Sequence, residues 1–380
     1  MPDARELRSE PVRFKTTAGA PAVKDRRTDF RAVFCEELGK AGLVAEDNVS
    51  CTRWLWRLPD EIDSRIAGAG PVLRPPELAL FIVTGAFSEC VGDEARPYMV
   101  AAEGLRKDGA YVEMIVAGGR SGTASNARQI AAAIERAQVP AERQLIVIGY
   151  SKGALDALRF LVDFPALAGQ VDAVVSVGGP IYGSPLAQLA EAPYAWFLAK
   201  IPYDKCPPGD AEVIRSLDPA TATQWLASNP LPSNVRYYSI TGFTTRKRVA
   251  RSLVPTWKIL SRTDVRNDGQ VVAADAVIPG STLLGYANAD HWGIATSIET
   301  VRTYLAARPD PTPFPLEALL RAMARFVSDD LERSAAFHCH WRPGAPESTI
   351  LVTPRDLRCD STKTFTREGC HGVFDSKFPG

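Results

Sequence analysis

A serine flanked by two glycines stands where an apolar run meets a helical pattern. Leu145–Ile148 (LIVI) is followed by Gly149, Ser151 and Gly153 in the spacing G-x-S-x-G, and helical periodicity begins at Ala154. A strand-to-helix turn this tight strains the serine backbone and turns its hydroxyl outward, and it leaves room only for small residues two positions away on either side. The spacing predicts a serine nucleophile, with an ordinary glycine-rich turn as the alternative.

A serine hydroxyl is a weak nucleophile until a base, most often a histidine, takes its proton. The chain has four histidines, and three of them (His338, His340 and His371) lie in its last 43 residues. The remaining one, His291, follows Ser151 in the chain order Ser, acid, His. His291 is therefore the predicted base.

The third member should be a carboxylate between the serine and the histidine, where it would orient the imidazole. The candidates are Asp264, Asp268, Asp275 and Asp290. Asp268 is favoured because it stands in the turn sequence Arg-Asn-Asp-Gly, where a glycine lets the chain reverse behind the carboxylate. Asp264 is the second choice, and a plain Asn-Asp-Gly turn is the structural alternative.

Apolar runs and helical stripes alternate around these residues. Strands are expected at 78–83, 111–116, 145–148, 171–177 and 235–240, and helices at 98–105, 126–137 and 154–162. Strands separated by helices indicate a parallel sheet with helices on both faces. The expected fold class is α/β, with a mostly parallel central sheet.

Three regions are expected along the chain. Residues 1–76 are predicted to be an N-terminal extension with one or two helices on the main domain, the first from Phe30 with Asp29 as its N-cap. Residues 77–337 form the catalytic domain, with a helical insertion at about 187–234 that contains Trp196, Phe197 and Trp225. Residues 338–380 lack apolar periodicity and are expected to be an irregular tail.

Composition narrows the function classes. With 44 basic and 44 acidic residues the formal net charge is zero, which argues against a general nucleic-acid binder. We find neither a membrane-spanning run nor a secretory leader, so a cytoplasmic protein is expected, with a secreted one that has lost its leader as the alternative. The oligomeric state is left open.

The seven cysteines do not suggest a disulfide framework, because their number is odd and their spacing irregular. Cys90 is expected to be a small buried thiol. The tail cysteines and histidines match no usual zinc spacing, so no metal is predicted.

Three segments resemble the bacterial triacylglycerol lipases and esterases of the Pseudomonas and Burkholderia type. Asn267–Val271 (NDGQV) followed by His291 is similar to the acid and histidine region of those enzymes. Val175–Ala187 is similar to their T-P-H-x-G-S-x-x-A-D segment, and Val83–Phe87 stands where they have H-G-x. The resemblance spans about 82 to 293 and implies an α/β-hydrolase fold with a helical lid.

The same resemblance implies the roles of individual residues. Ser151 would be the nucleophile, Asp268 the acid and His291 the base, and the backbone N–H groups of Ala86 and Lys152 would form the oxyanion hole. Phe87 is the alternative to Ala86, because the register of its loop is open.

The chain departs from the family pattern at three positions. Thr84 stands where the family has the histidine of the oxyanion loop, and Ile181 stands where it has a second histidine. Gly293 replaces the calcium-binding aspartate, so a calcium site is unsupported.

Cationic residues adjoin the proposed site. Lys152 is expected to point outward into solvent, although it could favour an anionic substrate group. The basic excess at 246–266 is expected to be a solvated face, with attraction to anionic lipid or polymer surfaces as the alternative.

The expected function is hydrolysis of small-molecule or lipid carboxylic esters by a serine esterase, without a cofactor. A thioesterase, polyester depolymerase, amidase or acyltransferase with the same three residues is the alternative, and a non-catalytic binding module is the other class.

Overall fold

The computed structural model describes residues 3–16, 19–43, 49–62, 72–91, 96–189, 207, 209–297, 310 and 312–338. The chain divides into two units, Met1–Phe326 and Val327–Gly380. The first unit holds the sheet and every element up to the start of α13 (Leu316–His338). Of the expected tail, only His338 is described, as the last residue of α13, and the remainder lies outside the described residues.

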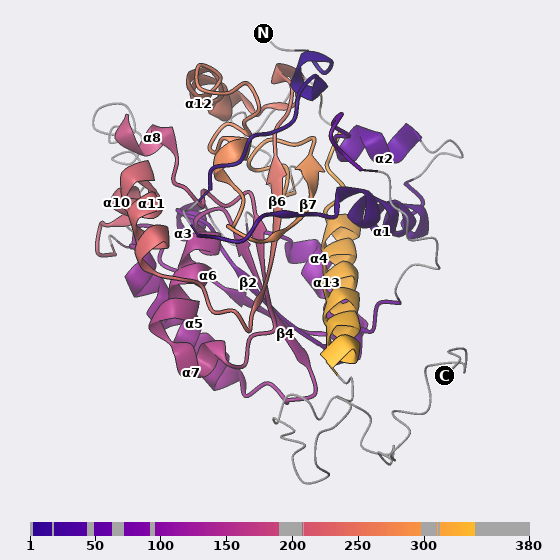
Figure 1. The fold of residues 1–380 in the computed structure, drawn as a ribbon, viewed down its shortest axis with the longest axis vertical. Helices are drawn as coiled ribbons and strands as arrows, with labels where there is room; N and C mark the ends of the chain where they lie inside the picture. The colour runs from indigo at the N-terminus through magenta and orange to yellow at the C-terminus, as the bar shows by residue number, and fades with distance from the viewer. Residues whose placement is uncertain are drawn as a thin grey trace. The chain divides into compact units, whose positions relative to one another are not determined.

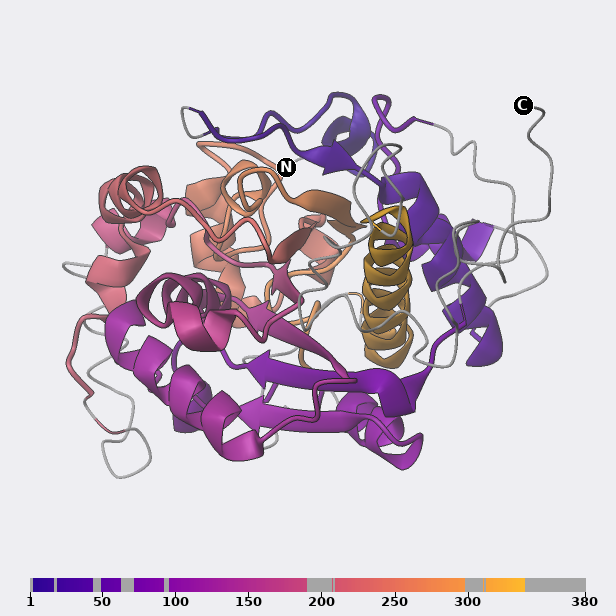
Figure 2. The same cartoon turned by 60° about the horizontal axis from the view of Figure 1, so that its bottom comes forward.

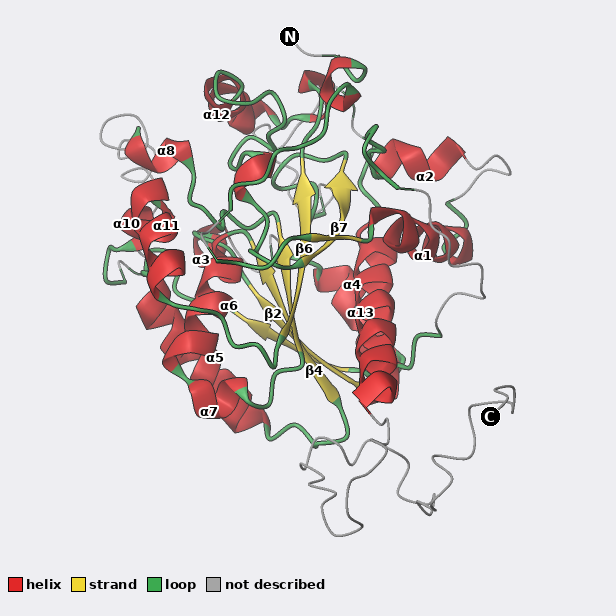
Figure 3. Ribbon diagram, in the orientation of Figure 1, coloured by secondary structure: helices red, strands yellow, loops and turns green. Residues whose placement is uncertain are grey.

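Seven parallel strands form one sheet in the order β1-β7-β6-β5-β4-β2-β3 (Figure 3). The strands are β1 (Lys24–Asp25), β2 (Leu78–Val83), β3 (Tyr111–Ile115), β4 (Gln144–Tyr150), β5 (Ala173–Val177), β6 (Arg236–Gly242) and β7 (Thr282–Ala287). The predicted fold class, a parallel sheet with helices on both faces, is confirmed.

Helices cover both faces of this sheet (Figures 1 and 2). One face packs against α5 and α6, where Phe81 and Val147 share a buried cluster with Ile130 and Leu158. On the other face, α1 and the first part of α13 meet through Phe30 and Phe326, whose ring centroids are 5.7 Å apart. The α-helices in the described residues are α1 (Arg27–Lys40), α2 (Val49–Trp54), α3 (Ser88–Val91), α4 (Met99–Lys107), α5 (Thr123–Ala137), α6 (Lys152–Asp163), α7 (Pro165–Ala168), α8 (Pro185–Gln188), α10 (Val213–Leu217), α11 (Pro219–Ser228), α12 (Val254–Leu260) and α13.

Short 3₁₀ turns fill several of the connections. They are η1 (Glu6–Arg8), η2 (Pro75–Glu77), η4 (Arg246–Arg248), η5 (Arg251–Leu253) and η6 (Ala273–Asp275). None of the helices in the described ranges is both long and apolar enough to cross a bilayer.

The segment expected to be an N-terminal extension contributes directly to the sheet. Its strand β1 pairs with β7 and forms one edge of the sheet. The first helix begins at Arg27 with Arg26 as its N-cap, so the prediction of Asp29 as N-cap was wrong. Asp29 lies inside the first turn instead, where it forms an ion pair with Arg26.

Cysteine pairing differs from the expectation. Cys35 of α1 forms a disulfide with Cys51 of α2. Cys90 is also disulfide-bonded, so the prediction of a buried free thiol was wrong. Sequence spacing did not reveal these bonds, because a disulfide requires proximity in the fold and not a regular interval along the chain.

All of the predicted site residues follow strands of the sheet. Ala86 lies in the loop after β2, Ser151 and Lys152 follow β4, Asp268 lies between β6 and β7, and His291 follows β7. In open α/β sheets, functional residues gather outside the carboxyl ends of the strands. The topology therefore brings these loops together at the carboxyl ends of the strands.

Candidate active site

Ser151 occupies a strained turn between β4 and α6. Its backbone has φ 54° and ψ −130°, a conformation that L-residues rarely adopt. A Cβ on Gly149 would lie 2.4 Å from the Cα of Ala154, and one on Gly153 would lie 2.5 Å from the backbone oxygen of Val83. Both glycines are therefore needed to bring the strand and the helix together at this angle, as the sequence argument required.

The turn places the Ser151 hydroxyl against His291. The distance from Nε2 of His291 to Oγ of Ser151 is 2.8 Å, and Nδ1 of His291 lies 2.7 Å from Oδ2 of Asp268. Asp268 is fully buried and His291 is 5% exposed, whereas Ser151 is partly exposed. The three residues selected from the sequence thus form one continuous hydrogen-bonded row.

The turn around Asp268 fixes its carboxylate. Oδ1 accepts hydrogen bonds from the backbone N–H groups of Gln270 (2.8 Å) and Val271 (2.7 Å), which leaves Oδ2 for His291. Gly269 has φ 95°, so the turn depends on a residue that tolerates the left-handed region. The backbone N–H of His291 also donates to the Asp268 carbonyl at 2.8 Å, which ties the two loops together.

The other candidate acids have different partners. Asp264 pairs with Arg266 at 3.1 Å, and Asp275 pairs with Lys15 at 2.8 Å. Asp290 accepts hydrogen bonds from the backbone N–H groups of Ala250 and Gly293, both at 2.7 Å. Of the four candidate aspartates, Asp268 is the one whose carboxylate is bonded to the His291 ring.

The loop after β2 passes directly against Ser151. A Cβ on Gly85 would lie 2.8 Å from the Cβ of Ser151. The N–H of Phe87 donates to the carbonyl of Gly119 at 3.1 Å and is thereby used within the protein. Because the Phe87 N–H has this partner, Ala86 is the better candidate in this loop for a backbone donor to an oxyanion. The second candidate donor, the backbone N–H of Lys152, lies in the first turn of α6, where an N–H group has no acceptor within the helix.

The side chain of Lys152 lies inside the protein, so the prediction that it points into solvent was wrong. Its Nζ lies 2.6 Å from Oδ1 of Asp156, and both side chains are 1% exposed. The amide of Asn126 donates to the other carboxylate oxygen of Asp156 at 2.7 Å. One helical turn separates Lys152 from Asp156, a spacing that brings their side chains together on α6.

Burial shifts the ionisation of carboxyl groups near Lys152. Desolvation raises the pKa of Asp156, and the Lys152 ammonium and the Asn126 amide oppose that rise. Desolvation also raises the pKa of Glu89 on α3, against the opposing charges of Arg120 and Lys152. The region beside the Ser151 turn therefore contains several charges in a poorly hydrated setting.

Tyr150 is a site residue that the sequence reasoning missed. Its hydroxyl donates to the backbone carbonyl of His291 at 2.8 Å, and the two rings lie 5.3 Å apart. The contact joins positions 141 residues apart, so nothing in the local sequence could have identified it.

The basic segment divides into buried and exposed cations. Arg248 is buried and pairs with Asp310, and Arg266 pairs with Asp264. The exposed members are Lys247, Arg251, Lys258 and Arg262. The expectation of a solvated face therefore applies to part of the segment.

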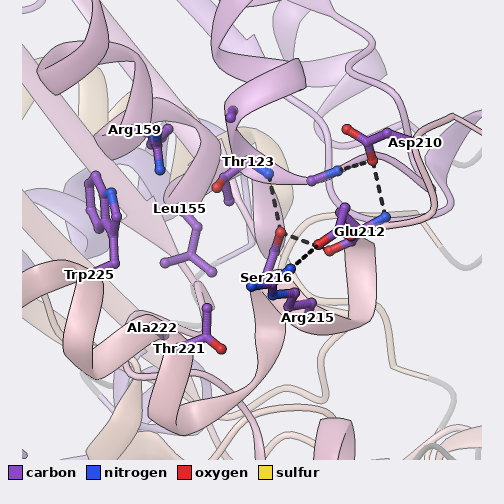
Figure 4. Close-up of a pocket in the computed structure, with 12 residues that line it drawn as sticks. Thr123, Leu155, Arg159, Asp210, Glu212, Arg215, Ser216, Thr221, Ala222 and Trp225 are labelled. Carbon is purple, nitrogen blue, oxygen red and sulfur yellow. Dashed lines mark hydrogen bonds and ion pairs between the residues drawn. The ribbon is translucent and has the colours of Figure 1, made fainter.

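The described part of the predicted lid is anchored at the start of α5 (Figure 4). Asp210 accepts hydrogen bonds from the N–H groups of Gly122 (2.8 Å) and Glu212 (3.0 Å), and Ser216 accepts one from Thr123 (3.2 Å). A cavity of about 200 Å³ lies here between α5, α6, α10 and α11, with Trp225 in its wall, and Ser151 does not line it. Trp196 and Phe197 lie outside the described residues.

The departures from the family pattern also have structural consequences. Ile181 is fully buried in the apolar cluster beneath α5 and α6. Gly293 offers a backbone N–H to Asp290 where the family has a carboxylate. Within the described ranges, no group of three or more His, Cys, Asp or Glu side chains could hold a metal ion.

Comparison with known proteins finds similarity to solved structures. No family model and no curated protein matches the chain. Among solved structures, the chain is similar to the metagenomic carboxyl esterase MGS0156, with 35% identity and a TM-score of 0.74 over 85% of this chain and 97% of that one.

Two further solved structures match with lower scores. The mature Bacillus licheniformis lipase BlEst2 has 22% identity and a TM-score of 0.48, over 67% of this chain and 96% of that one. Staphylococcus hyicus lipase has 12% identity and a TM-score of 0.48, over 71% of this chain and 100% of that one. The identity and coverage of the MGS0156 match show that this chain belongs to the carboxyl esterases of the α/β-hydrolase fold.

Proposed function

We propose that this protein hydrolyses carboxylic esters through an acyl-enzyme on Ser151. The observation that carries the proposal is the row of hydrogen bonds from Asp268 through His291 to Ser151, with distances of 2.7 and 2.8 Å. A nucleophile within hydrogen-bond reach of a base, which a third group orients, is the arrangement that activates a serine.

Acylation begins as His291 Nε2 takes the Ser151 proton and Oγ bonds to the ester carbonyl carbon. The resulting tetrahedral intermediate collapses, its bond to the alcohol oxygen breaks, and His291 returns the proton to the departing alcohol. Water then attacks the acyl-enzyme with His291 again as the base, which releases the carboxylic acid and restores Ser151. Asp268 holds the ring through Nδ1 and stabilises the imidazolium formed in each half.

The backbone N–H groups of Ala86 and Lys152 are the proposed donors to the oxyanion. Donors fixed before reaction, and aimed where negative charge develops, stabilise the transition state more than the ground state. Loss of one such donor lowers kcat by about 10²–10³-fold in serine hydrolases. The proximity of the Gly85 loop to Ser151 supports this assignment for Ala86.

The proposed substrates are small-molecule or lipid esters, and a substrate panel tests this directly. Wild-type protein, Ser151→Ala and the exposed control Ser228→Ala would be assayed on p-nitrophenyl esters from acetyl to palmitoyl, with matched thioesters alongside. We expect Ser151→Ala to lose at least about 10³-fold in kcat/KM and Ser228→Ala to match the wild type. Preferential turnover of thioesters would move the assignment to a thioesterase, and full activity in Ser151→Ala would overturn the mechanism.

A further inference from the structure

We propose that Lys152, Asp156 and Asn126 form a buried positioning network that holds the two walls of the oxyanion hole in register. The proposal rests on the proposed function of Ser151 and deepens it. It assigns these side chains no contact with the substrate. Their role is to fix the backbone from which the two N–H donors project.

The first wall is the opening turn of α6. Lys152 provides a backbone N–H there, and its own side chain is pinned by Asp156 at 2.6 Å with both groups 1% exposed. Asp156 lies one turn further along α6 and is held at its second oxygen by Asn126 of α5, at 2.7 Å. The residue that offers the donor is therefore fixed at both its backbone and its side chain.

The second wall is the loop that contains Ala86. The same Asn126 amide donates to the carbonyl of Gly118 at 3.1 Å. The next residue, Gly119, accepts a hydrogen bond from the N–H of Phe87 at 3.1 Å. A Cβ on Gly119 would lie 2.6 Å from that nitrogen, so the two loops are in tight contact beside Ala86.

These contacts form one path between the walls. It runs from Lys152 through Asp156 and Asn126 to Gly118 and Gly119, and from there to the residue after Ala86. Catalysis by preorganised donors requires their positions to be held within a fraction of an ångström, and a displacement of about 1 Å can lower the rate about 10²-fold. A hydrogen-bonded path between two loops from different strands supplies that constraint.

The burial of the pair argues for a role beyond stability. A buried ion pair loses hydration energy that its attraction only partly recovers, and apolar side chains of similar size often serve stability as well or better. Helix α6 carries a second pair at the same spacing, Arg159 with Asp163, whose side chains are 30% and 29% exposed. Helix α6 therefore contains two ion pairs of the same spacing, one buried beside the proposed oxyanion hole and one partly exposed to solvent.

Removing one charge of the buried pair tests the proposal, with the exposed pair as the control. We expect Asp156→Asn and Lys152→Met to lower kcat for p-nitrophenyl butyrate about 10–100-fold, with KM changed by less than about threefold. Affinity for a trifluoromethyl ketone, whose serine adduct places an oxyanion in the hole, should fall by the same factor as kcat. Asp163→Asn should leave all three quantities at wild-type values.

A paired substitution keeps the test decisive if a single variant does not fold. Lys152→Met/Asp156→Leu removes both charges and fills the site with apolar groups. If this double variant has the unfolding temperature, the kcat and the inhibitor affinity of the wild type, the network has no positioning role and the proposal is overturned. A folded double variant with reduced kcat, reduced inhibitor affinity and unchanged KM supports it.

Covalent labelling of Ser151 distinguishes failure of the positioning network from failure of the proposed function. Fluorophosphonate modification of Ser151 in the wild type, together with full kcat in Asp156→Asn and the double variant, would refute the positioning network alone. Failure of the wild type to label at Ser151 would refute the proposed function, and the network proposal with it.

Discussion

The hydroxyl of Tyr150 donates a 2.8 Å hydrogen bond to the backbone carbonyl of His291. Tyr150 is the last residue of β4 and directly precedes Ser151, so the strand that ends at the proposed nucleophile also holds the loop of the proposed base. The two rings, 5.3 Å apart, add packing to the hydrogen bond. The residue before Ser151 is thereby bonded to the backbone of the residue that supplies the proposed base.

Tyr150→Phe should therefore lower kcat while preserving the fold. The variant retains the ring contact, but the His291 carbonyl loses its hydrogen-bond donor. A net hydrogen-bond contribution of about 0.5–1.5 kcal/mol corresponds to a decrease in kcat of about 2–10-fold. Tyr237→Phe is the matched control, because that hydroxyl also donates to a backbone carbonyl, of Pro232 at 2.9 Å. Steady-state kinetics would check both variants, and equal kcat values would refute the positioning role of Tyr150.

Asp268→Asn should lower kcat much more than Tyr150→Phe. The amide keeps the shape of the side chain but presents a donor to Nδ1 and favours the wrong imidazole tautomer, an effect worth about 10⁴-fold in kcat in serine proteases. Asp264→Asn serves as the control, since its carboxylate pairs with Arg266. Ester turnover within about twofold of wild type in Asp268→Asn would show that another group orients His291.

Gly153→Ala should disrupt the Ser151 turn. The new methyl would lie 2.5 Å from the backbone oxygen of Val83 and 2.6 Å from that of Thr84, neither of which can move as a flexible side chain could. Overpacking of this kind costs about 1–3 kcal/mol or more. Thermal and urea unfolding would measure the loss.

Gly104→Ala is the control for that glycine. It lies in α4, and its methyl would meet only the side-chain ends of Glu317 and Arg321 at 3.2 and 3.3 Å. Because alanine favours a helix over glycine by about 1 kcal/mol, this variant should be neutral or more stable. Equal stability of the two alanine variants would contradict the steric account of the turn.

The Cys35–Cys51 disulfide should contribute to stability. It closes a loop with a sequence separation of 16, for which chain entropy predicts about 3 kcal/mol. Urea unfolding of Cys35→Ser/Cys51→Ser under non-reducing conditions would measure the loss, and alkylation of both cysteines in the untreated wild type would contradict the bond.

The residues of the proposed site were predictable where chemistry restricts residue type. Gly149, Ser151 and Gly153 were found because few residues fit a strained strand-to-helix turn. His291 was found because the body of the chain has no other imidazole. Asp268 was chosen from four aspartates by its turn sequence, and the structure bonds it to His291.

The remaining features depend on contacts between distant parts of the chain. The two-residue strand β1 becomes visible only by its pairing with β7, and β7 itself (TLLGYA) shows neither alternation nor a long β-branched run. The charge of Lys152 predicted exposure, and burial follows from Asp156 and from Asn126 on a different helix. Such partners, which are distant in the sequence, cannot be identified from local sequence patterns.

Covalent labelling of Ser151 is the most direct test of the proposed acyl-enzyme. Wild-type protein and Ser151→Ala would be treated with an alkyl fluorophosphonate, and intact mass and peptide mapping would locate the adduct. We expect one phosphonyl group on Ser151, complete loss of ester turnover in step with labelling, and no adduct in Ser151→Ala. An adduct on another residue, or a labelled protein that still hydrolyses esters, would contradict an acyl-enzyme on Ser151.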